Sequence, residues 1–309
     1  MNGISDGLAE ISLNFEPGAL QLLNLIIALV VFGVALDLRV EDFLRVLRSP
    51  RAPLIGLSSQ FLLMPAFATL VVWLLQPHPS IGLGIILVAA CPGGSVSNFF
   101  TSLARGNAAL SVSMSAISTL ASIVMTPFNF LFWGALNPHT ADLIRDIEVA
   151  PQQIFFTVLT ILIIPTILGM VAAWWRPALA ALLLKPMRIL SIMVMIGFVM
   201  VAFAANWQNF LNHIGLAFWI VLLVNGAGLL LGYGLGQVTG LSVADCKAVA
   251  FETGIQNTAF GLLLIFNFFG GQGGMALIAA WWGVWHLISG LGLSLLWARQ
   301  ARRIEAVPV

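Results

Sequence analysis

Residues 250–259 read Ala-Phe-Glu-Thr-Gly-Ile-Gln-Asn-Thr-Ala and interrupt a long apolar stretch of the chain. Glu252 lies deep in this hydrophobic span, where a charged side chain is costly and marks a substrate, ion or proton site by default. Gly254 allows the helix to break, and broken backbone at membrane depth is tolerated only where it is buried in protein or lines a cavity. The segment therefore offers a carboxylate, two side-chain amides and free backbone carbonyls, which are suitable ligands for a small hard cation.

The whole chain has the composition of a membrane protein. Of its 309 residues, 60% are hydrophobic and 8% are charged, whereas soluble domains carry about 25% charged residues. The apolar runs are long and continuous rather than alternating as in an outer-membrane barrel, so we expect an all-α polytopic protein in the lipid bilayer. The net charge of +1 gives no indication of a nucleic-acid partner, and nothing in the sequence indicates an obligatory protein partner.

Windows of about 20 apolar residues predict about nine membrane spans. The predicted spans are 18–37, 53–76, 81–104, 107–134, 151–175, 187–206, 214–237, 243–269 and 273–298. The connections between them are short, and none is long enough to form a soluble domain.

The distribution of basic residues supports this count. With the N-terminus outside, all of the 13 Lys and Arg residues except Arg145 fall in inside segments, as the positive-inside rule requires. Residues 1–17 contain no Lys or Arg, so they lack the positive region of a signal peptide and are expected to be extracytoplasmic. Residues 299–309 are expected to form a cytoplasmic tail.

Glycine interrupts two of the predicted spans. The third span contains Cys-Pro-Gly-Gly-Ser-Val-Ser-Asn at 91–98, where Pro92 removes a helical donor and the two glycines lower the cost of unwinding. The eighth span breaks at Gly254, directly before the polar residues 256–258. A single break would more often be a packing kink. Two matched breaks, in spans that cross in opposite directions, indicate a transporter site built from an inverted repeat.

The seventh predicted span carries two further features. Gly228, Gly232 and Gly236 are spaced by four residues, which predicts close packing against another helix. Asn225 is expected to cap a helix or to form a hydrogen bond between helices.

Four motifs follow one another in a specific order: CPGGSVSN at 91–98, LARGNAALSVSMSAISTL at 103–120, FETGIQNTAFG at 251–261 and WHLISG at 285–290. In order and spacing they closely resemble the bile acid:sodium symporter family, and the resemblance runs from about Leu22 to Ala298. It implies the nine-helix form of the family, which lacks the first of ten helices, in a bacterial inner membrane.

The resemblance also implies two domains with crossing, broken helices. The panel domain would comprise residues 18–37 and 151–206, and the core domain residues 53–134 and 214–298. The broken helices of the core would cross near residues 92–95 and 253–256.

By the same resemblance, two sodium ions are expected behind this crossing. The first would be bound by Ser97, Asn98, Ser111, Ser115 and the carboxylate of Glu252. The second would be bound by Gln60, Gln256 and backbone oxygens near Glu252, Thr253 and Ile255. Oxygen-only ligands with one negative charge suit a hard monovalent cation, and the absence of Cys/His clustering from the sequence argues against zinc or copper.

The substrate is expected beside the crossing, toward the panel domain. Helix N-termini at the two breaks offer free N–H groups and positive dipole ends, which favour an anionic group. Ser95, Asn257 and His286 are the polar candidates for contact with it. Some bacterial family members have asparagine after this histidine, whereas this chain has Leu287. This difference favours a smaller carboxylate, such as pantoate or a 2-oxo acid, over a bile acid.

The leading hypothesis is therefore sodium-coupled symport of an organic anion by alternating access, without enzymatic activity. The alternative is a proton-coupled or uncoupled organic-anion carrier of the same fold, with Glu252 as the titrating group. An intramembrane enzyme is a remote alternative, because the sequence contains no HExxH motif and no intramembrane aspartate pair, and His286 has no evident Ser or Cys partner.

Overall fold

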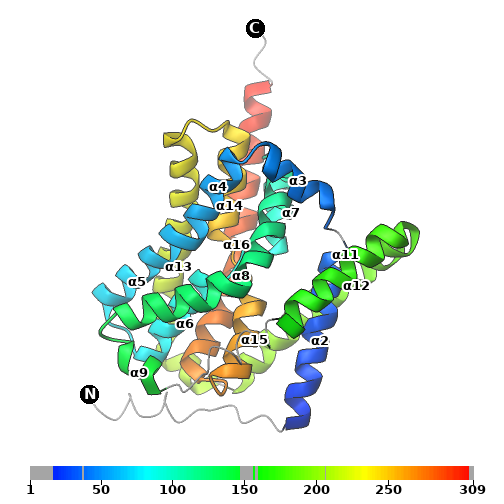
Figure 1. The fold of residues 1–309 in the computed structure, drawn as a ribbon. Coiled ribbons are helices and arrows are strands. Elements are labelled where there is room, and N and C mark those ends of the chain that lie inside the picture. Colours follow the sequence, from blue (N-terminus) through cyan, green and yellow to red (C-terminus); the bar gives the residue numbers. More distant parts are fainter. Residues whose placement is uncertain (1–16, 37, 147–155, 157–158, 206, 306–309) are drawn as a thin grey trace.

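The structure is a computed structural model that describes residues 17–36, 38–146, 156, 159–205 and 207–305. In this part of the chain the secondary structure is helical, with one isolated β-bridge. Four helices are long and apolar enough to cross a membrane: Arg51–Leu75, Ala108–Leu136, Ala217–Val238 and Gly273–Ala301. These features agree with the predicted polytopic α-helical membrane protein (Figure 1). The total of about nine spans stays a prediction, because the other apolar helices are shorter.

The helices follow one another along the chain with short connections. The first group comprises α2 (Pro17–Ala35), α3 (Val40–Arg48), α4 (Arg51–Ser58), the π-helix η1 (Ser59–Leu63), α5 (Met64–Leu75), α6 (Pro79–Ala90), α7 (Ser95–Leu103), α8 (Ala108–Leu136) and α9 (Ala141–Asp146). The second group comprises the π-helix η2 (Leu159–Ile163), α11 (Ile164–Trp175), α12 (Pro177–Ala205), α13 (Trp207–Val238), α14 (Val243–Gly254), α15 (Thr258–Phe268) and α16 (Gly273–Glu305).

Both interrupted spans are broken in the structure. The segment predicted as one span over 81–104 consists of α6 and α7, with α6 ending before Cys91 and α7 beginning at Ser95. The segment predicted over 243–269 consists of α14 and α15, with non-helical backbone at Ile255–Asn257. We call residues 91–94 and 255–257 together the crossover.

A proline explains the π-helix between α4 and α5. Pro65 has no N–H group, so it cannot donate to the carbonyl of Phe61 four residues earlier. That carbonyl instead accepts a hydrogen bond from the side chain of Asn129 on α8, at 2.8 Å. The wider π turn contains Gln60, which is fully buried. Single π turns inside α-helices are frequent at functional sites.

Helices α13 and α14 pack closely, as the glycine spacing predicts. A β-carbon at Gly232 would lie 2.7 Å from the carbonyl oxygen of Val249, and one at Gly236 would lie 2.9 Å from the Sγ atom of Cys246. Only glycine allows this backbone approach, which places α13 directly behind the second broken helix.

Hydrogen bonds connect the turns between α3 and α4, between α7 and α8, and between α13 and α14 at one end of the molecule. Asn107, before α8, bonds the Asp245 carboxylate of α14 at 2.7 Å. Lys247 on α14 donates to the carbonyl of Ala104 at the end of α7, at 2.8 Å. Arg51 donates to the carbonyl of Thr239 after α13. These turns lie at the end of the molecule where α16 ends (Figure 1).

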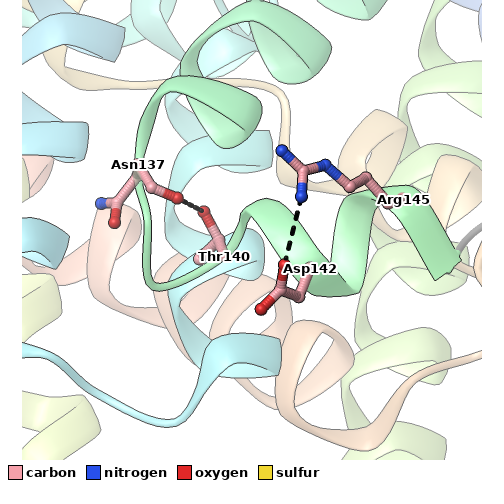
Figure 2. A network of polar contacts seen from close by, with 4 residues as sticks. All are labelled: Asn137, Thr140, Asp142 and Arg145. Carbon is pink, nitrogen blue, oxygen red and sulfur yellow. Dashed lines mark hydrogen bonds and ion pairs between the residues drawn. The ribbon is translucent and has the colours of Figure 1, made fainter.

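The turn between α8 and α9 lies at the opposite end (Figure 1). Its Asn137 donates to the carbonyl of Thr69 on α5 at 3.2 Å, and the hydroxyl of Thr140 bonds the carbonyl oxygen of Asn137 (Figure 2). Arg145, the one basic residue expected outside, lies 3.5 Å from the exposed carboxylate of Asp142 (Figure 2). Exposed ion pairs of this kind contribute little to stability. The prediction that Arg145 lies outside the membrane on the extracytoplasmic side therefore stays a prediction.

Helices α2, α11 and α12 form a group along one side of the molecule (Figure 1). Small residues allow α2 to approach both neighbours, since a β-carbon at Gly169 of α11 would meet Ala35 and the carbonyl oxygen of Phe32, and one at Gly33 would meet Met187 of α12. The crossover lies in the remaining helices, so these three helices stand beside the broken pair rather than within it.

Candidate functional site

The two breaks meet in a short antiparallel bridge between Gly93 and Gln256. The backbone N–H of Gly94 donates to the carbonyl of Ile255 at 2.9 Å, and the N–H of Asn257 donates to the carbonyl of Pro92 at 2.8 Å. Each broken segment therefore satisfies part of the other's backbone, which non-helical backbone at membrane depth requires.

Side chains from neighbouring helices bind the carbonyls left free where α6 and α14 end. Thr126 of α8 donates to the carbonyl of Ala90 at 2.7 Å, and Gln60 donates to that of Cys91 at 3.4 Å. Asn225 of α13 donates to the carbonyl of Gly254 at 2.7 Å, as expected for a hydrogen bond between helices. These contacts fix both half-helices in a scaffold of unbroken helices.

Glu252 lies beside the crossover and is completely buried. Its Oε2 atom accepts hydrogen bonds from Ser97 at 3.0 Å and from Ser115 at 2.9 Å. Its Oε1 atom accepts one from Ser118 at 3.2 Å. A β-carbon at Gly93 would overlap this carboxylate, so the glycine backbone forms the opposite wall of the pocket.

No Lys or Arg side chain pairs with Glu252 in the part of the chain that the structure describes. The other buried charged residue there is Lys247, which bonds the end of α7. A buried charge without an opposite charge is strongly unfavourable, even when it is hydrogen-bonded. The pocket is therefore chemically complete only with a cation or a proton from solution.

The other residues predicted for the first ion surround this carboxylate. The side-chain oxygen of Asn98 accepts a hydrogen bond from Ser111 at 2.7 Å and lies 3.2 Å from the hydroxyl of Ser115, for which it is a second acceptor beside Glu252. Ser115 therefore contacts both Asn98 and Glu252. The structure thus connects all five predicted residues, Ser97, Asn98, Ser111, Ser115 and Glu252, in one hydrogen-bonded cluster.

The residues predicted for the second ion come from the π-helix η1 and from the end of α14 with the residues that follow it. The Oε1 atom of Gln60 and the Oγ1 atom of Thr253 are buried and have no hydrogen-bond partner among the described residues. Gln256 donates to the carbonyl of Thr253, while the carbonyl of Ile255 accepts from Gly94. Buried acceptors without donors are rare in native structures, and they are suitable ligands for a hard cation.

The three predicted substrate contacts have different environments. Ser95, at the N-terminus of α7, is exposed. Asn257 is half-buried and caps α15, accepting from the N–H of Phe260 at 3.0 Å. His286 is buried and its Nε2 atom lies 3.1 Å from the Oε1 atom of Gln256. Ser95 and Asn257 thus lie at helix N-termini of the crossover, whereas His286 contacts a residue predicted for the second ion.

Sequence reasoning did not assign roles to Ser118 and Thr126. Ser118 lies one turn after Ser115 on α8, so the spacing of Ser111, Ser115 and Ser118 could have indicated it. Thr126 lies directly before Pro127, and no pattern in the sequence indicates that it bonds the end of α6.

Comparison with known proteins gives the family. The model of the Sodium Bile acid symporter family matches residues 24–213, which is more than half of the chain. The chain belongs to this family. The matched region includes the first break and the serines of α8, while Glu252 and the second break lie beyond it.

Similarity to individual family members extends into the second half. The chain is 30% identical over 284 residues to the uncharacterized sodium-dependent transporter YocS of Bacillus subtilis (strain 168), covering 92% of the chain and 85% of that protein. It is 29% identical to the probable sodium/metabolite cotransporter BASS1, chloroplastic, of Arabidopsis thaliana, covering 89% of the chain and 66% of that protein. It is 28% identical to the human ileal sodium/bile acid cotransporter, covering 76% of the chain and 66% of that protein. The chain is thus a member of a family of sodium-dependent membrane transporters.

Proposed function

We propose that the protein is a sodium-coupled symporter that carries a small organic anion across the bacterial inner membrane. The observation that carries this proposal is the fully buried carboxylate of Glu252, which has three hydroxyl partners and no cationic partner in the described chain. Sodium supplies the missing positive charge. Hydroxyl, amide and carboxylate oxygens are ligands that suit such a hard cation.

The first ion binds among Ser97, Asn98, Ser111, Ser115 and Glu252. Serine hydroxyls both donate and accept, so Ser97 and Ser115 turn their lone pairs toward the ion when it enters. The carboxylate then exchanges hydrogen bonds from these hydroxyls for a direct contact with the cation. This exchange explains how the same cluster accommodates both the empty and the occupied state.

The second ion binds between Gln60 and the end of α14. The unpartnered oxygen of Gln60 is the strongest support for this site. The other ligands are Gln256 and backbone oxygens near Glu252, Thr253 and Ile255. The hydroxyl oxygen of Thr253, also buried and unpartnered, adds a further acceptor there. The first ion contacts the carboxylate of Glu252 and the second contacts backbone oxygens near it, so the two sites share the end of α14.

The anion binds on the exposed face of the crossover, at Ser95 and Asn257. The N-termini of α7 and α15 direct positive dipole ends and free N–H groups to this face. Because sodium orders the same backbone from its buried side, ion and anion binding are coupled, and each raises the affinity for the other. His286 connects the two sites through Gln256.

Transport then requires the site to open alternately to each side. We assign α2, η2–α11 and α12 to the panel, and the helices around the crossover to the core, which moves against it. The core carries both breaks and their supporting side chains, so ions and anion move with it as one unit. The end where α16 ends, which carries Arg51 and Lys247 in its turns, faces the cytoplasm, in accord with the positive-inside rule.

The substrate class comes from the names of the relatives and from Leu287. One relative is named for metabolites and another for bile acid, and Leu287 lacks the polar amide that some bacterial family members carry after this histidine. We therefore assign a small carboxylate, of the size of pantoate or a 2-oxo acid.

A thermal-shift screen of the purified protein tests this proposal. Small carboxylates and bile acids are each added in sodium and in potassium. We expect stabilisation by small carboxylates in sodium alone, because the cation completes the anion site. Stabilisation that ignores sodium and follows pH would instead establish a proton-coupled carrier, and stabilisation by bile acids alone would overturn the substrate assignment.

Glu252→Gln is the decisive variant. It keeps the shape of the side chain and removes its charge, so stabilisation by sodium and sodium-driven uptake should both be lost while the protein stays folded. Asp245→Asn is the matched control, because Asp245 lies on the same helix but bonds Asn107 and Ser242 at its far end. A Glu252→Gln protein with a normal sodium response would refute the ion site.

A further inference from the structure

We infer that Ser118 is a positioning residue for the sodium site: it holds the Oε1 atom of Glu252 so that Oε2 faces the ion. This inference rests on the proposed function and goes beyond it, because Ser118 is not among the residues expected to bind either ion. The observation behind it is the division of hydrogen bonds between the two carboxylate oxygens.

The two oxygens of Glu252 have different partners. Oε2 contacts Ser97 at 3.0 Å and Ser115 at 2.9 Å, whereas Oε1 contacts Ser118 alone, at 3.2 Å, among the described side chains. The ion proposed for this cluster binds on the Oε2 side. Ser118 therefore donates to the oxygen that does not need to be free for the ion.

The three hydroxyls respond differently when sodium enters. Each hydroxyl has one proton and donates it to one acceptor at a time. Ser97 and Ser115 present lone pairs to the cation, so their protons turn away from it and the carboxylate loses both donors. Ser118 makes no such exchange, and it remains as the hydroxyl that donates to Glu252 in both states.

The hydroxyl of Ser118 has two possible hydrogen-bond acceptors. Its hydroxyl lies 3.2 Å from Oε1 of Glu252 and 3.2 Å from the carbonyl oxygen of Ser115. Hydrogen bonds to a charged acceptor are stronger than those between neutral groups, so the carboxylate is the preferred partner.

The carboxylate is thus held in a slot between α8 and the crossover. Gly93 packs against it from the crossover, where a β-carbon would overlap Oε1, and Ser118 holds the same oxygen from α8. Rotation of the carboxylate about its last torsion is restricted from both sides. A ligand that is already oriented loses less entropy when the ion binds, and partners that orient metal ligands commonly contribute tenfold or more to affinity.

Ser122→Ala is a matched control for Ser118→Ala. Both serines are completely buried on α8, four residues apart and on one face. The Ser122 hydroxyl donates to the carbonyl of Thr119 at 2.7 Å and does not contact the carboxylate. The two variants therefore remove the same atom from similar surroundings, and only one of them affects Glu252.

The test is a sodium titration of the purified variants, followed by thermal unfolding, with potassium chloride holding the ionic strength constant. We expect Ser118→Ala to raise the sodium concentration for half-maximal stabilisation by about three- to tenfold, and Ser122→Ala to leave it unchanged. In potassium alone, both variants should unfold at similar temperatures. Ser118→Thr, which retains the hydroxyl, should recover most of the affinity for sodium.

A second measurement separates positioning from direct ligation. In sodium-driven uptake, Ser118→Ala should reach the maximal rate of the unmodified protein at high sodium. An equal shift in Ser118→Ala and Ser122→Ala, or no shift in either, overturns the inference. Loss of all sodium response in Ser118→Ala, as expected for Glu252→Gln, would identify a direct ligand and overturns it as well. An unmodified protein without any sodium response would refute the proposed function itself.

Discussion

At the scale of single residues, the site is built from groups that both donate and accept. Serine hydroxyls around Glu252 satisfy the carboxylate when they donate, and they bind a cation when they turn. Lysine or arginine in their place would neutralise the carboxylate permanently, and the carboxylate would then no longer attract sodium. In the proposed function, the absence of such a partner in the described chain is what leaves the carboxylate available to sodium.

Gln60 provides a test of the second ion. Gln60→Leu keeps the volume of the side chain and removes its unpartnered oxygen. We expect the sodium dependence of uptake to change from sigmoidal to hyperbolic, with the half-activating concentration raised about tenfold, equal to ~1.4 kcal/mol. The measurement is the initial rate of uptake against sodium concentration.

Thr69→Val is the control for this change, since Thr69 is buried further along the same span and its hydroxyl bonds the carbonyl of Pro65. Its sodium curve should match that of the unmodified protein. A sigmoidal curve that survives Gln60→Leu would remove Gln60 from the ion site.

At the scale of helices, the crossover depends on close packing between the backbone of Gly93 and the side chain of Glu252. The backbone of Gly93 does not lie in the positive-φ region that favours glycine. Other residues could therefore adopt its backbone conformation. What excludes a side chain is the carboxylate of Glu252, which occupies the space of a β-carbon. Glycine is required here for close approach rather than for an unusual dihedral angle.

Gly93→Ala should therefore displace Glu252 and lower sodium affinity by about tenfold or more, because a metal ligand that loses its orientation binds less well. The added methyl group should also lower stability, since overpacking a buried site typically costs about 1–3 kcal/mol. Sodium titration and thermal unfolding measure the two effects separately.

Gly226→Ala serves as the comparison, because a β-carbon at Gly226 would meet no atom of another residue within 4 Å. This variant should keep both its stability and its sodium affinity. If Gly93→Ala behaved in the same way, the close contact with Glu252 would have no functional role.

Both breaks were predictable from the sequence, and the residues clustered around Glu252 were indicated by the family resemblance, while the contacts that support them were not predictable. Pro92 and Gly254 disrupt a helix locally, so their effect is visible in a single segment. The bonds from Thr126 and Asn225 to the half-helices join positions 36 and 29 residues apart. Such pairs depend on how whole helices pack, which no local pattern records. Gln60 was indicated only by the family resemblance, although its π turn follows from Pro65.

At the scale of the whole molecule, one polar contact ties α2 to the helices around the crossover. Asn24 on α2 and Asn267 on α15 donate to each other, at 2.9 Å and 2.8 Å. Asn267 also bonds the carbonyl of Leu263 on its own helix, at 3.0 Å. Amide pairs of this kind contribute to helix association within membranes. In the proposed cycle this pair connects the panel with the core.

Movement of the core against the panel should break the pair between Asn24 and Asn267. Cysteines at both positions, joined by a short thiol-reactive cross-linker, should therefore stop uptake, and a reductant that cleaves the linker should restore it. The buried native cysteines, Cys91 and Cys246, are replaced by alanine beforehand. Sodium binding should persist in the linked protein, because the pair lies outside the ion cluster.

Asn107 and Asp245 offer a control pair, since their side chains also lie within hydrogen-bond distance but both belong to the core. A linker there should leave uptake unchanged. Continued uptake with Asn24 and Asn267 linked would show that these two helices keep their contact throughout the cycle.

In the proposed cycle, the buried carboxylate of Glu252 also determines how membrane voltage acts on the protein. In the proposed cycle, the empty pocket carries one negative charge, and two sodium ions with a monovalent anion bring it to neutrality. Moving one elementary charge across the whole membrane changes the free energy by about 2.3 kcal/mol per 100 mV. The voltage therefore acts on the return of the empty pocket and not on the loaded step. A negative interior drives Glu252 back toward the outside, where the next sodium ions bind.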